Sequence, residues 1–120
     1  MLTKLLSLYM WTVSYDERLE EWLQEIPSDI KARVLRIVDM LVQFGPGNAR
    51  EPYVKPVKGY KKLFEIRAKG RNGIARVFYF THRSKTIVLL HGFTKKTAKT
   101  PQREIEVAIR RMKEYPEWQD

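Results

Sequence analysis

The residues best suited to chemistry in this chain are basic, and three of them stand between a predicted strand and a predicted helix. Lys95, Lys96 and Lys99 follow the apolar run "IVLLHGF" and precede Thr100 and Pro101, a pair typical of a helix N-cap and first turn. A helix N-terminus carries partial positive charge, and three ammonium groups beside it favour an anion such as phosphate. A solvated loop is the commoner context for such lysines, so both interpretations stay open.

Two arginines occur in neighbouring predicted strands. Arg67 lies in "KLFEIRA", on the same face as Glu65, and Arg76 lies in "IARVFYF", after a turn at Asn72-Gly73. We expect Arg67 and Arg76 on one open sheet face, where their planar guanidinium groups suit phosphate oxygens. An arginine in a strand is also often the cross-strand partner of a glutamate, here Glu65.

Further candidates come from the segment before these strands and from the last strand. Tyr60 could stack on a nucleobase, and Lys61 and Lys62 could contact phosphate. His91 lies in an apolar strand, and strict alternation places it on the same face as Ile87, Leu89 and Phe93. A hydrogen-bonded interior histidine is commoner there than a catalytic base. The chain has no cysteine and no acids clustered beside its histidines, so we expect no metal and no cofactor.

The charge of the chain is high and unevenly distributed. The net charge is +9, yet residues 15–29 hold six acids and one arginine, whereas residues 55–111 hold 16 Lys/Arg and 3 Glu. A polyanionic partner explains this asymmetry, with nucleic acid favoured over membrane because no segment is both basic and strongly apolar on one helical face. A basic surface kept for solubility is the alternative. The lack of cysteine and of a signal-peptide cleavage site indicates the reducing cytoplasm.

The order of predicted elements is β-α-α-β-β-β-α, which defines an α+β fold with a small, mainly antiparallel sheet. Residues 9–15 predict a strand, and Ser14 with Glu17 fits a capping box that opens the first helix. A second helix begins near Ser28 or Asp29 and ends at Gly45; we expect the two helices to form an antiparallel hairpin.

The remaining segments complete one domain over residues 1–120, with residues 1–9 as an N-terminal extension and 115–120 as a tail. Residues 45–59 read as a long loop, either functional or a plain connection. Three strands with short turns follow, and a last helix begins at Thr100. We expect the helices on one sheet face and along one edge, leaving the other face to a ligand.

Two segments resemble the phage-derived, HigB-type branch of the RelE toxin superfamily: "LFEIRAKGRNGIARVFYF" and "IVLLHGFTKKTAKTPQREIEVAIRRM". The matching motifs are Glu65-Ile66-Arg67, Arg76-Val77-Phe78-Tyr79-Phe80, Leu90-His91-Gly92-Phe93-Thr94-Lys95-Lys96-Thr97 and Ala108-Ile109-Arg110-Arg111. The similarity covers roughly residues 10–114, in the same order of elements. It implies a type II toxin, a ribosome-dependent mRNA endonuclease that uses the RNA 2′-hydroxyl without a metal, and a cognate helix-turn-helix antitoxin in a toxin–antitoxin hetero-oligomer.

The resemblance also implies roles for individual residues. Arg67, Arg76, Lys95 and Lys96 match basic positions of the family and become the expected catalytic residues, with Arg76→Ala expected to leave the fold intact. Glu65 and His91 are reserve candidates for the general base, and Lys61, Lys62, Lys99 and Tyr60 are expected RNA or phosphate contacts. A tyrosine that contributes to cleavage in RelE is replaced here by Ile105.

Two alternatives stay open within the same fold. One is a non-catalytic toxin or nucleic-acid-binding protein, such as a poison of DNA gyrase. The other is a degenerate toxin that binds its antitoxin but no longer cleaves RNA.

Overall fold

The structure, a computed structural model, describes residues 10–49, 52–82, 85–95 and 99–115. The predicted extension 1–9, residues 116–120 of the predicted tail, and Lys96 lie outside these ranges. The elements in chain order are β1 (Thr12–Tyr15), α2 (Glu17–Glu25), α3 (Ser28–Phe44), a 3-10 turn (Pro46–Asn48), β2 (Val54–Pro56), β3 (Phe64–Gly70), β4 (Gly73–His82), β5 (Thr86–Lys95) and α4 (Gln102–Lys113).

The five strands form one mixed sheet in the order β1-β5-β4-β3-β2. β1 runs parallel to β5, and all other neighbours are antiparallel, so the predicted α+β class and mainly antiparallel sheet are confirmed. The segment predicted as a loop over residues 45–59 contains the 3-10 turn and the short strand β2. Pro56 is tolerated there because β2 lies at the sheet edge.

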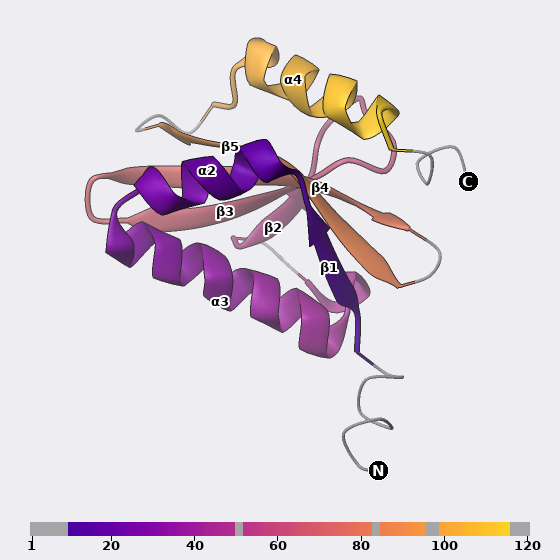
Figure 1. Cartoon of the computed structure of the whole chain (residues 1–120), viewed down its shortest axis with the longest axis horizontal. Helices are drawn as coiled ribbons and strands as arrows, with labels where there is room; N and C mark the ends of the chain where they lie inside the picture. Colours follow the sequence, from indigo (N-terminus) through magenta and orange to yellow (C-terminus); the bar gives the residue numbers. More distant parts are fainter. Residues whose placement is uncertain (1–9, 50–51, 83–84, 96–98, 116–120) are drawn as a thin grey trace.

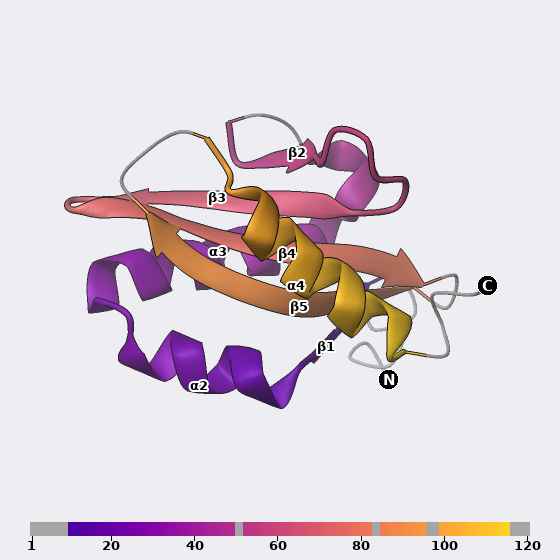
Figure 2. The same ribbon diagram turned by 90° about the horizontal axis from the view of Figure 1, so that it is seen from above.

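Helices cover both faces of the sheet, which corrects the expectation that they share one face. In Figures 1 and 2, α2 and α3 lie on one side of the sheet and α4 crosses the other side, over β4 and β5. The physical reason is visible in the sequence of β5: its run "IVLL" is apolar at consecutive positions, so both faces of the strand need cover.

Two hydrophobic clusters follow from this arrangement. On one face, α3 contributes Ile30, Val34, Ile37 and Leu41, which pack with Ile66, Ala68, Val77, Tyr79 and Leu89 of the sheet. On the other face, α4 contributes Ile105, Ala108 and Met112, which pack with Leu63, Phe78, Phe80, Val88 and Leu90. The sheet therefore stands between two cores, and α2 and α3 each lie mainly against the sheet, over β5 and β3 respectively.

The first helix is capped differently from the predicted Ser14–Glu17 box. Asp16 is the N-cap: its carboxylate accepts the backbone N–H of Arg18 at 2.9 Å and the Arg18 guanidinium at 2.6–2.7 Å. The hydrogen bond with the Arg18 side chain holds the pKa of Asp16 below its usual range. Ser14 belongs to β1 instead, so the helix starts two residues later than the box requires.

One glycine permits the close packing of α2 on the sheet. A Cβ atom at Gly92 of β5 would overlap the ring of Trp22. Only a residue without a side chain therefore fits beneath that ring.

In the described part of the chain, no helix is long and apolar enough to cross a membrane.

Candidate functional site

Strand register brings three of the predicted cations onto one sheet face. Arg67 of β3 lies directly opposite Arg76 of β4, and the next strand, β5, places Phe93 opposite Arg76 and Lys95 opposite Ile74. Paired positions share a face, and this face is the one covered by α4. Arg67 and Arg76 therefore share one sheet face, as expected, and Lys95 lies on the same face two residues beyond the position opposite Arg76.

The two arginines differ in exposure, which corrects the expectation of an open guanidinium pair. The side chain of Arg67 is 24% exposed, whereas that of Arg76 is 0% exposed. Glu65, 2% exposed, lies between them, with Oε1 3.6 Å from Arg67 Nε and 3.5 Å from Arg76 Nη1. One carboxylate thus faces two guanidinium groups, and the cluster keeps a local charge of +1.

Thr100 closes this cluster from above the sheet. Its hydroxyl accepts a hydrogen bond from Arg76 Nη1 at 2.7 Å and donates to the Glu65 carboxylate at 3.0–3.1 Å. Thr100 was expected to cap the last helix, but Pro101 occupies the cap position and no side chain caps α4. The hydroxyl is instead used to satisfy a buried ion pair, whose polar atoms cannot reach water.

The environment of Arg76 acts against its charge but does not remove it. Burial lowers the pKa of Arg76, and the positive charge of Arg67 lowers it further, while Glu65 raises it. A guanidinium group remains protonated in proteins despite such shifts, so Arg76 is a buried cation that depends on Glu65.

His91 shares a sheet face with Phe93, as predicted, but not with Ile87 and Leu89. A bulge in β5 pairs Phe78 with His91 but Tyr79 with Leu89, leaving Leu90 as the extra residue. The bulge reverses the alternation, so His91 lies on the α4 face, opposite to Leu89. Its ring stacks beside those of Phe78 and Phe93, at centroid distances of 6.2 Å to each, and the two phenylalanine rings are 5.9 Å from one another.

The imidazole of His91 is also bonded to α4. Its Nε2 lies 2.8 Å from Oε1 of Glu104, a geometry in which the neutral ring donates its N–H to the carboxylate. Burial lowers the pKa of His91, the bond to Glu104 opposes that shift, and the positive charges of Arg111 and Arg18 reinforce it. His91 therefore joins β5 to α4 as a neutral donor at neutral pH.

The other predicted contacts surround the N-terminus of α4. Lys99 is exposed just before the helix, and Lys61 and Lys62 are exposed in the turn that precedes β3. That turn is joined to α4 because Tyr60 Oη accepts a 2.7 Å hydrogen bond from Gln102 Nε2. Tyr60 is half-buried and packs on the cluster beneath α4.

Ile105 is excluded from chemistry by its surroundings. Its side chain is 8% exposed and belongs to the core between α4 and the sheet, where it contributes packing. Within the described ranges of the chain, no group of three or more His, Asp or Glu side chains could hold a metal ion.

Sequence reasoning missed the roles of Thr100 and Gln102, because both residues read as ordinary helix-start residues.

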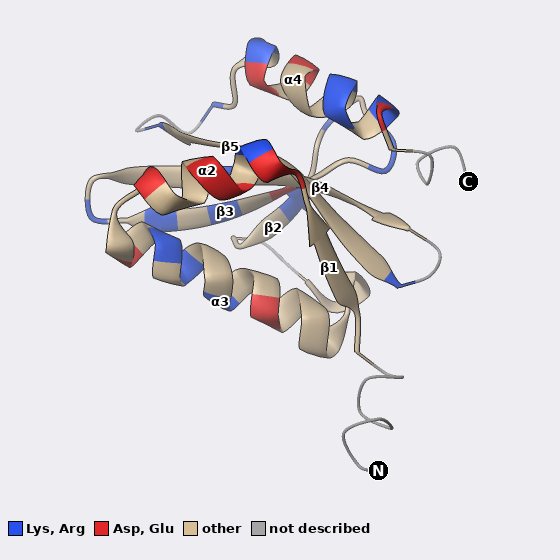
Figure 3. Cartoon of the chain, in the orientation of Figure 1, with Lys and Arg blue, Asp and Glu red and all other residues tan. Residues whose placement is uncertain are grey.

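Figure 3 shows the acids concentrated on α2 and basic residues on β3 and at the end of α4. The acidic segment 15–29 therefore lies on the sheet face opposite to that of Arg67 and Arg76.

A mixed five-stranded sheet with two helices on one face and a C-terminal helix on the other is the fold of RelE-type toxins. The chain is similar to archaeal RelE in the RelE–RelB complex from Pyrococcus horikoshii OT3, with 25% identity, a TM-score of 0.56, and coverage of 74% of this chain and 99% of that one. It is also similar to the E. coli toxin RelE, solved in the free state as a double arginine-to-alanine mutant, with 13% identity, a TM-score of 0.64, and coverage of 86% and 98%.

Residues 21–113 match the family described as "Phage derived protein Gp49-like (DUF891)", and the chain belongs to that family. Among curated protein sequences, none matches this chain. The resemblance to the phage-derived, HigB-like branch with RelE-type structural neighbours is confirmed.

Proposed function

We propose that this chain is the toxin of a type II toxin–antitoxin pair and that it cleaves mRNA on the ribosome. The observation that carries the proposal is the convergence of Arg67, Arg76 and Lys95 from three adjacent strands on one sheet face. A single carboxylate balances the two guanidinium groups, so the face retains positive charge for an RNA backbone. The similarity to a RelE solved with RelB supports an antitoxin partner.

Metal-free cleavage needs three things from such a face. The RNA 2′-hydroxyl loses its proton and attacks the adjacent phosphorus, the phosphorane gains negative charge, and the 5′-oxygen leaves with a proton. Positioning and charge stabilisation supply most of the rate enhancement. Arg67, the more exposed arginine, contacts the phosphorane oxygens, and Lys95 anchors the phosphate at the end of β5. Lys96, outside the described residues, keeps its predicted role beside Lys95 as anchor and proton donor.

Arg76 acts through its neighbours in this proposal. Because it is fully buried against Glu65 and Thr100, it fixes the side chain of Glu65 and the start of α4. Glu65 and His91 are positioning residues for the same reason: Glu65 accepts from Thr100, and His91 is engaged by Glu104. The base is supplied from elsewhere, by the RNA, the ribosome or solvent.

The exposed lysines extend the contact with RNA. Flanking phosphates around the start of α4 are bound by Lys61, Lys62 and Lys99. Tyr60 holds the turn that carries Lys61 and Lys62 against the helix, through its hydrogen bond with Gln102. Each such contact is expected to add to the salt dependence of RNA binding.

The test is cleavage of a defined mRNA in vitro, with and without ribosomes, mapped by primer extension. We expect discrete breaks with ribosomes, ending in 2′,3′-cyclic phosphate, and a loss of about 100-fold or more in rate for Arg67→Ala, comparable to removal of one charge-stabilising donor. Arg110→Ala, an exposed cation on α4, serves as the matched control and should retain activity. Intact mRNA under both conditions, or DNA damage signalling without mRNA breaks in cells, would overturn the proposal.

A further inference from the structure

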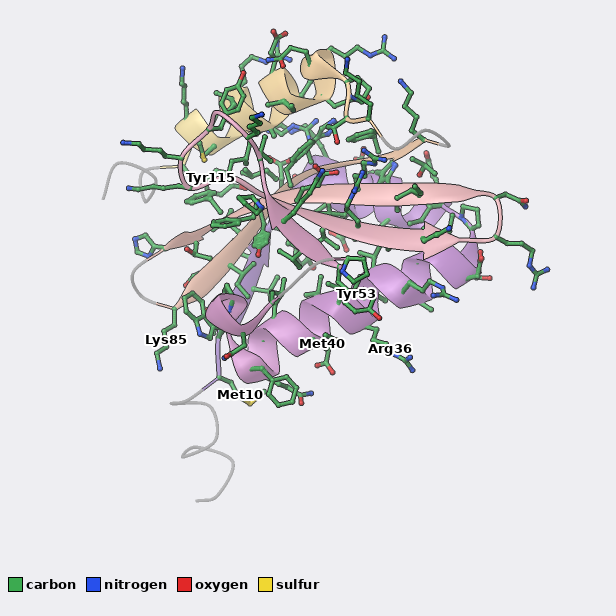
Figure 4. The ribbon with its side chains drawn as sticks, turned by 180° about the vertical axis from the view of Figure 1, so that it is seen from behind. Met10, Arg36, Met40, Tyr53, Lys85 and Tyr115 are labelled. Atoms are coloured by element: carbon green, nitrogen blue, oxygen red, sulfur yellow. The ribbon has the colours of Figure 1, made fainter. Side chains whose placement is uncertain are left out.

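A groove runs along α3, on the side of the sheet opposite to α4. Arg36, Met40 and Phe44 recur every four residues, so they share one stripe of the helix. A cavity of about 820 Å³ lies beside this stripe and is lined by Ile37, Met40 and Tyr53, among others. A second cavity of about 530 Å³ shares these three residues and continues to Phe44. Figure 4 shows Arg36 and Met40 along α3, with Tyr53 beside the helix. We call the two cavities together the α3 groove.

The α3 groove exposes large apolar side chains. Met40, Phe44 and Tyr53 are 40%, 65% and 52% exposed, and none of them belongs to either hydrophobic cluster. Leu35, also exposed, lies on the other side of α3 and lines neither cavity. Neighbouring exposed apolar side chains mark a contact surface, whereas a single one such as Leu35 is ordinary. The groove therefore has the composition of a binding site for an apolar surface.

The end of the groove nearest the start of α3 is basic. Arg33 and Arg36 of α3 and Lys69 of β3 are exposed and line the larger cavity. Asp29 also lines it, but its carboxylate accepts the backbone N–H of Arg71 at 3.2 Å. The smaller cavity, at the other end of α3, has no charged side chain among its described lining residues. The groove is thus basic at one end and apolar at the other.

We propose that the α3 groove binds an amphipathic, acidic helix of a partner polypeptide, laid along α3. The apolar stripe of that helix covers Met40, Phe44 and Tyr53, and carboxylates at one of its ends lie beside Arg33 and Arg36. α3 has 17 residues and is therefore about 25 Å long, so a partner helix of similar length follows the whole groove. Contacts between side chains suffice for this mode of binding, and no strand edge takes part.

Three other occupants fit the groove less well. A second copy of this chain offers α2 as its acidic helix, but Leu19 is buried and Trp22 and Leu23 pack against the same core, so the apolar stripe of α2 is already used. RNA gains cations at one end only, because the apolar end has no partner for its phosphates. The predicted extension, residues 1–9, contains Lys4 and no acid, so it lacks the charge that the basic end favours.

The binding test uses the full chain and a fluorescein-labelled peptide of about 18 residues, long enough to span α3 as a helix. The peptide carries leucines on one helical face and glutamates in its N-terminal half, and its binding is followed by fluorescence anisotropy. We expect the wild type to bind, and Arg36→Glu and Met40→Lys each to bind about tenfold more weakly.

Each of these variants has a matched control. Arg110→Glu makes the same charge change on α4, and Leu35→Lys places the same cation on the other side of α3; both should bind as the wild type does. All four positions are exposed, so circular dichroism should show the same fold. The proposal fails if the glutamate peptide does not bind at millimolar concentration, or if the variants bind as their controls do.

An exchange of charges tests whether the carboxylates contact the arginines. The wild type should bind poorly to a peptide with lysine in place of glutamate, whereas the double variant Arg33→Glu/Arg36→Glu should prefer this lysine peptide. A folded double variant that still prefers the glutamate peptide, or binds neither, would show that the carboxylates do not lie beside these arginines.

A last set of measurements tests the helical form and the other occupants. A proline in the middle of the glutamate peptide breaks its helix and should abolish binding; equal binding contradicts a helical occupant. Three results assign the groove elsewhere and overturn the proposal: RNA whose affinity falls in Met40→Lys while the peptide stays unbound, a homodimer on gel filtration that Met40→Lys dissolves, and peptide binding that is seen only in Leu5→Glu. Because no RNA cleavage is measured, this test fails independently of the proposed function.

Discussion

Replacing the buried Arg76 by alanine should destabilise the fold, contrary to the expectation from sequence that the fold stays intact. Arg76 is 0% exposed and Glu65 is 2% exposed, so neither charge is compensated by water. Without the guanidinium, the Glu65 carboxylate keeps, among the described residues, Arg67 Nε at 3.6 Å and the Thr100 hydroxyl. The variant leaves a carboxylate partly uncompensated inside the protein.

The magnitude follows from the geometry. Opposite unit charges separated by 3.5 Å attract by about 5 kcal/mol at an effective dielectric constant of about 20. Removal of one partner of a buried pair typically costs about 3–5 kcal/mol, and the remaining contact with Arg67 places Arg76→Ala near the lower value. Against a total stability of about 5–15 kcal/mol, such a loss removes a large share of the folded state's margin.

Urea unfolding followed by circular dichroism measures this cost. Arg76→Ala should lower the unfolding free energy by about 3 kcal/mol, and Thr100→Val by about 1–2 kcal/mol, since a buried hydrogen-bond partner is lost. The double variant Glu65→Leu/Arg76→Met should be less destabilised than Arg76→Ala, because it removes both charges. Arg110→Ala, on the exposed face of α4, gives the reference. If Arg76→Ala unfolds within about 0.5 kcal/mol of that reference, the buried network does not carry the stability assigned to it.

Three further outcomes follow from other contacts. Gly92→Ala should cost about 1–3 kcal/mol in urea unfolding, because its Cβ overlaps the ring of Trp22; an unchanged midpoint would refute the close packing of α2. Folding lowers the pKa of His91, so the unfolded chain binds that proton more tightly and the unfolding free energy should fall as the pH drops below about 6.5. His91→Gln should remove this pH dependence. If the pH dependence persists in His91→Gln, it does not come from His91. Folding also lowers the pKa of Asp16, so its contribution is present above pH 3.8 and lost below it; Asp16→Asn should flatten a stability titration in that acid range.

The sequence predicted most of the architecture because its hydrophobic periods are regular. The stripe Ile30, Val34, Ile37 and Leu41 is buried as one helical face, and the arginines in "EIRA" and "ARVF" meet across a hairpin whose register the turn determines. Both are local patterns, so a window of some ten residues contains the information.

What the sequence did not reveal depends on long-range geometry. The bulge at Leu90 changes the face on which His91 lies, and no local residue marks it. Thr100 reads as a helix cap, but the hydroxyl is used by Glu65, 35 residues earlier in the chain. Arg76 is buried because α4 covers the sheet face on which it lies, and the position of α4 on that face is not marked in the local sequence. Each of these outcomes requires knowing which segments pack together.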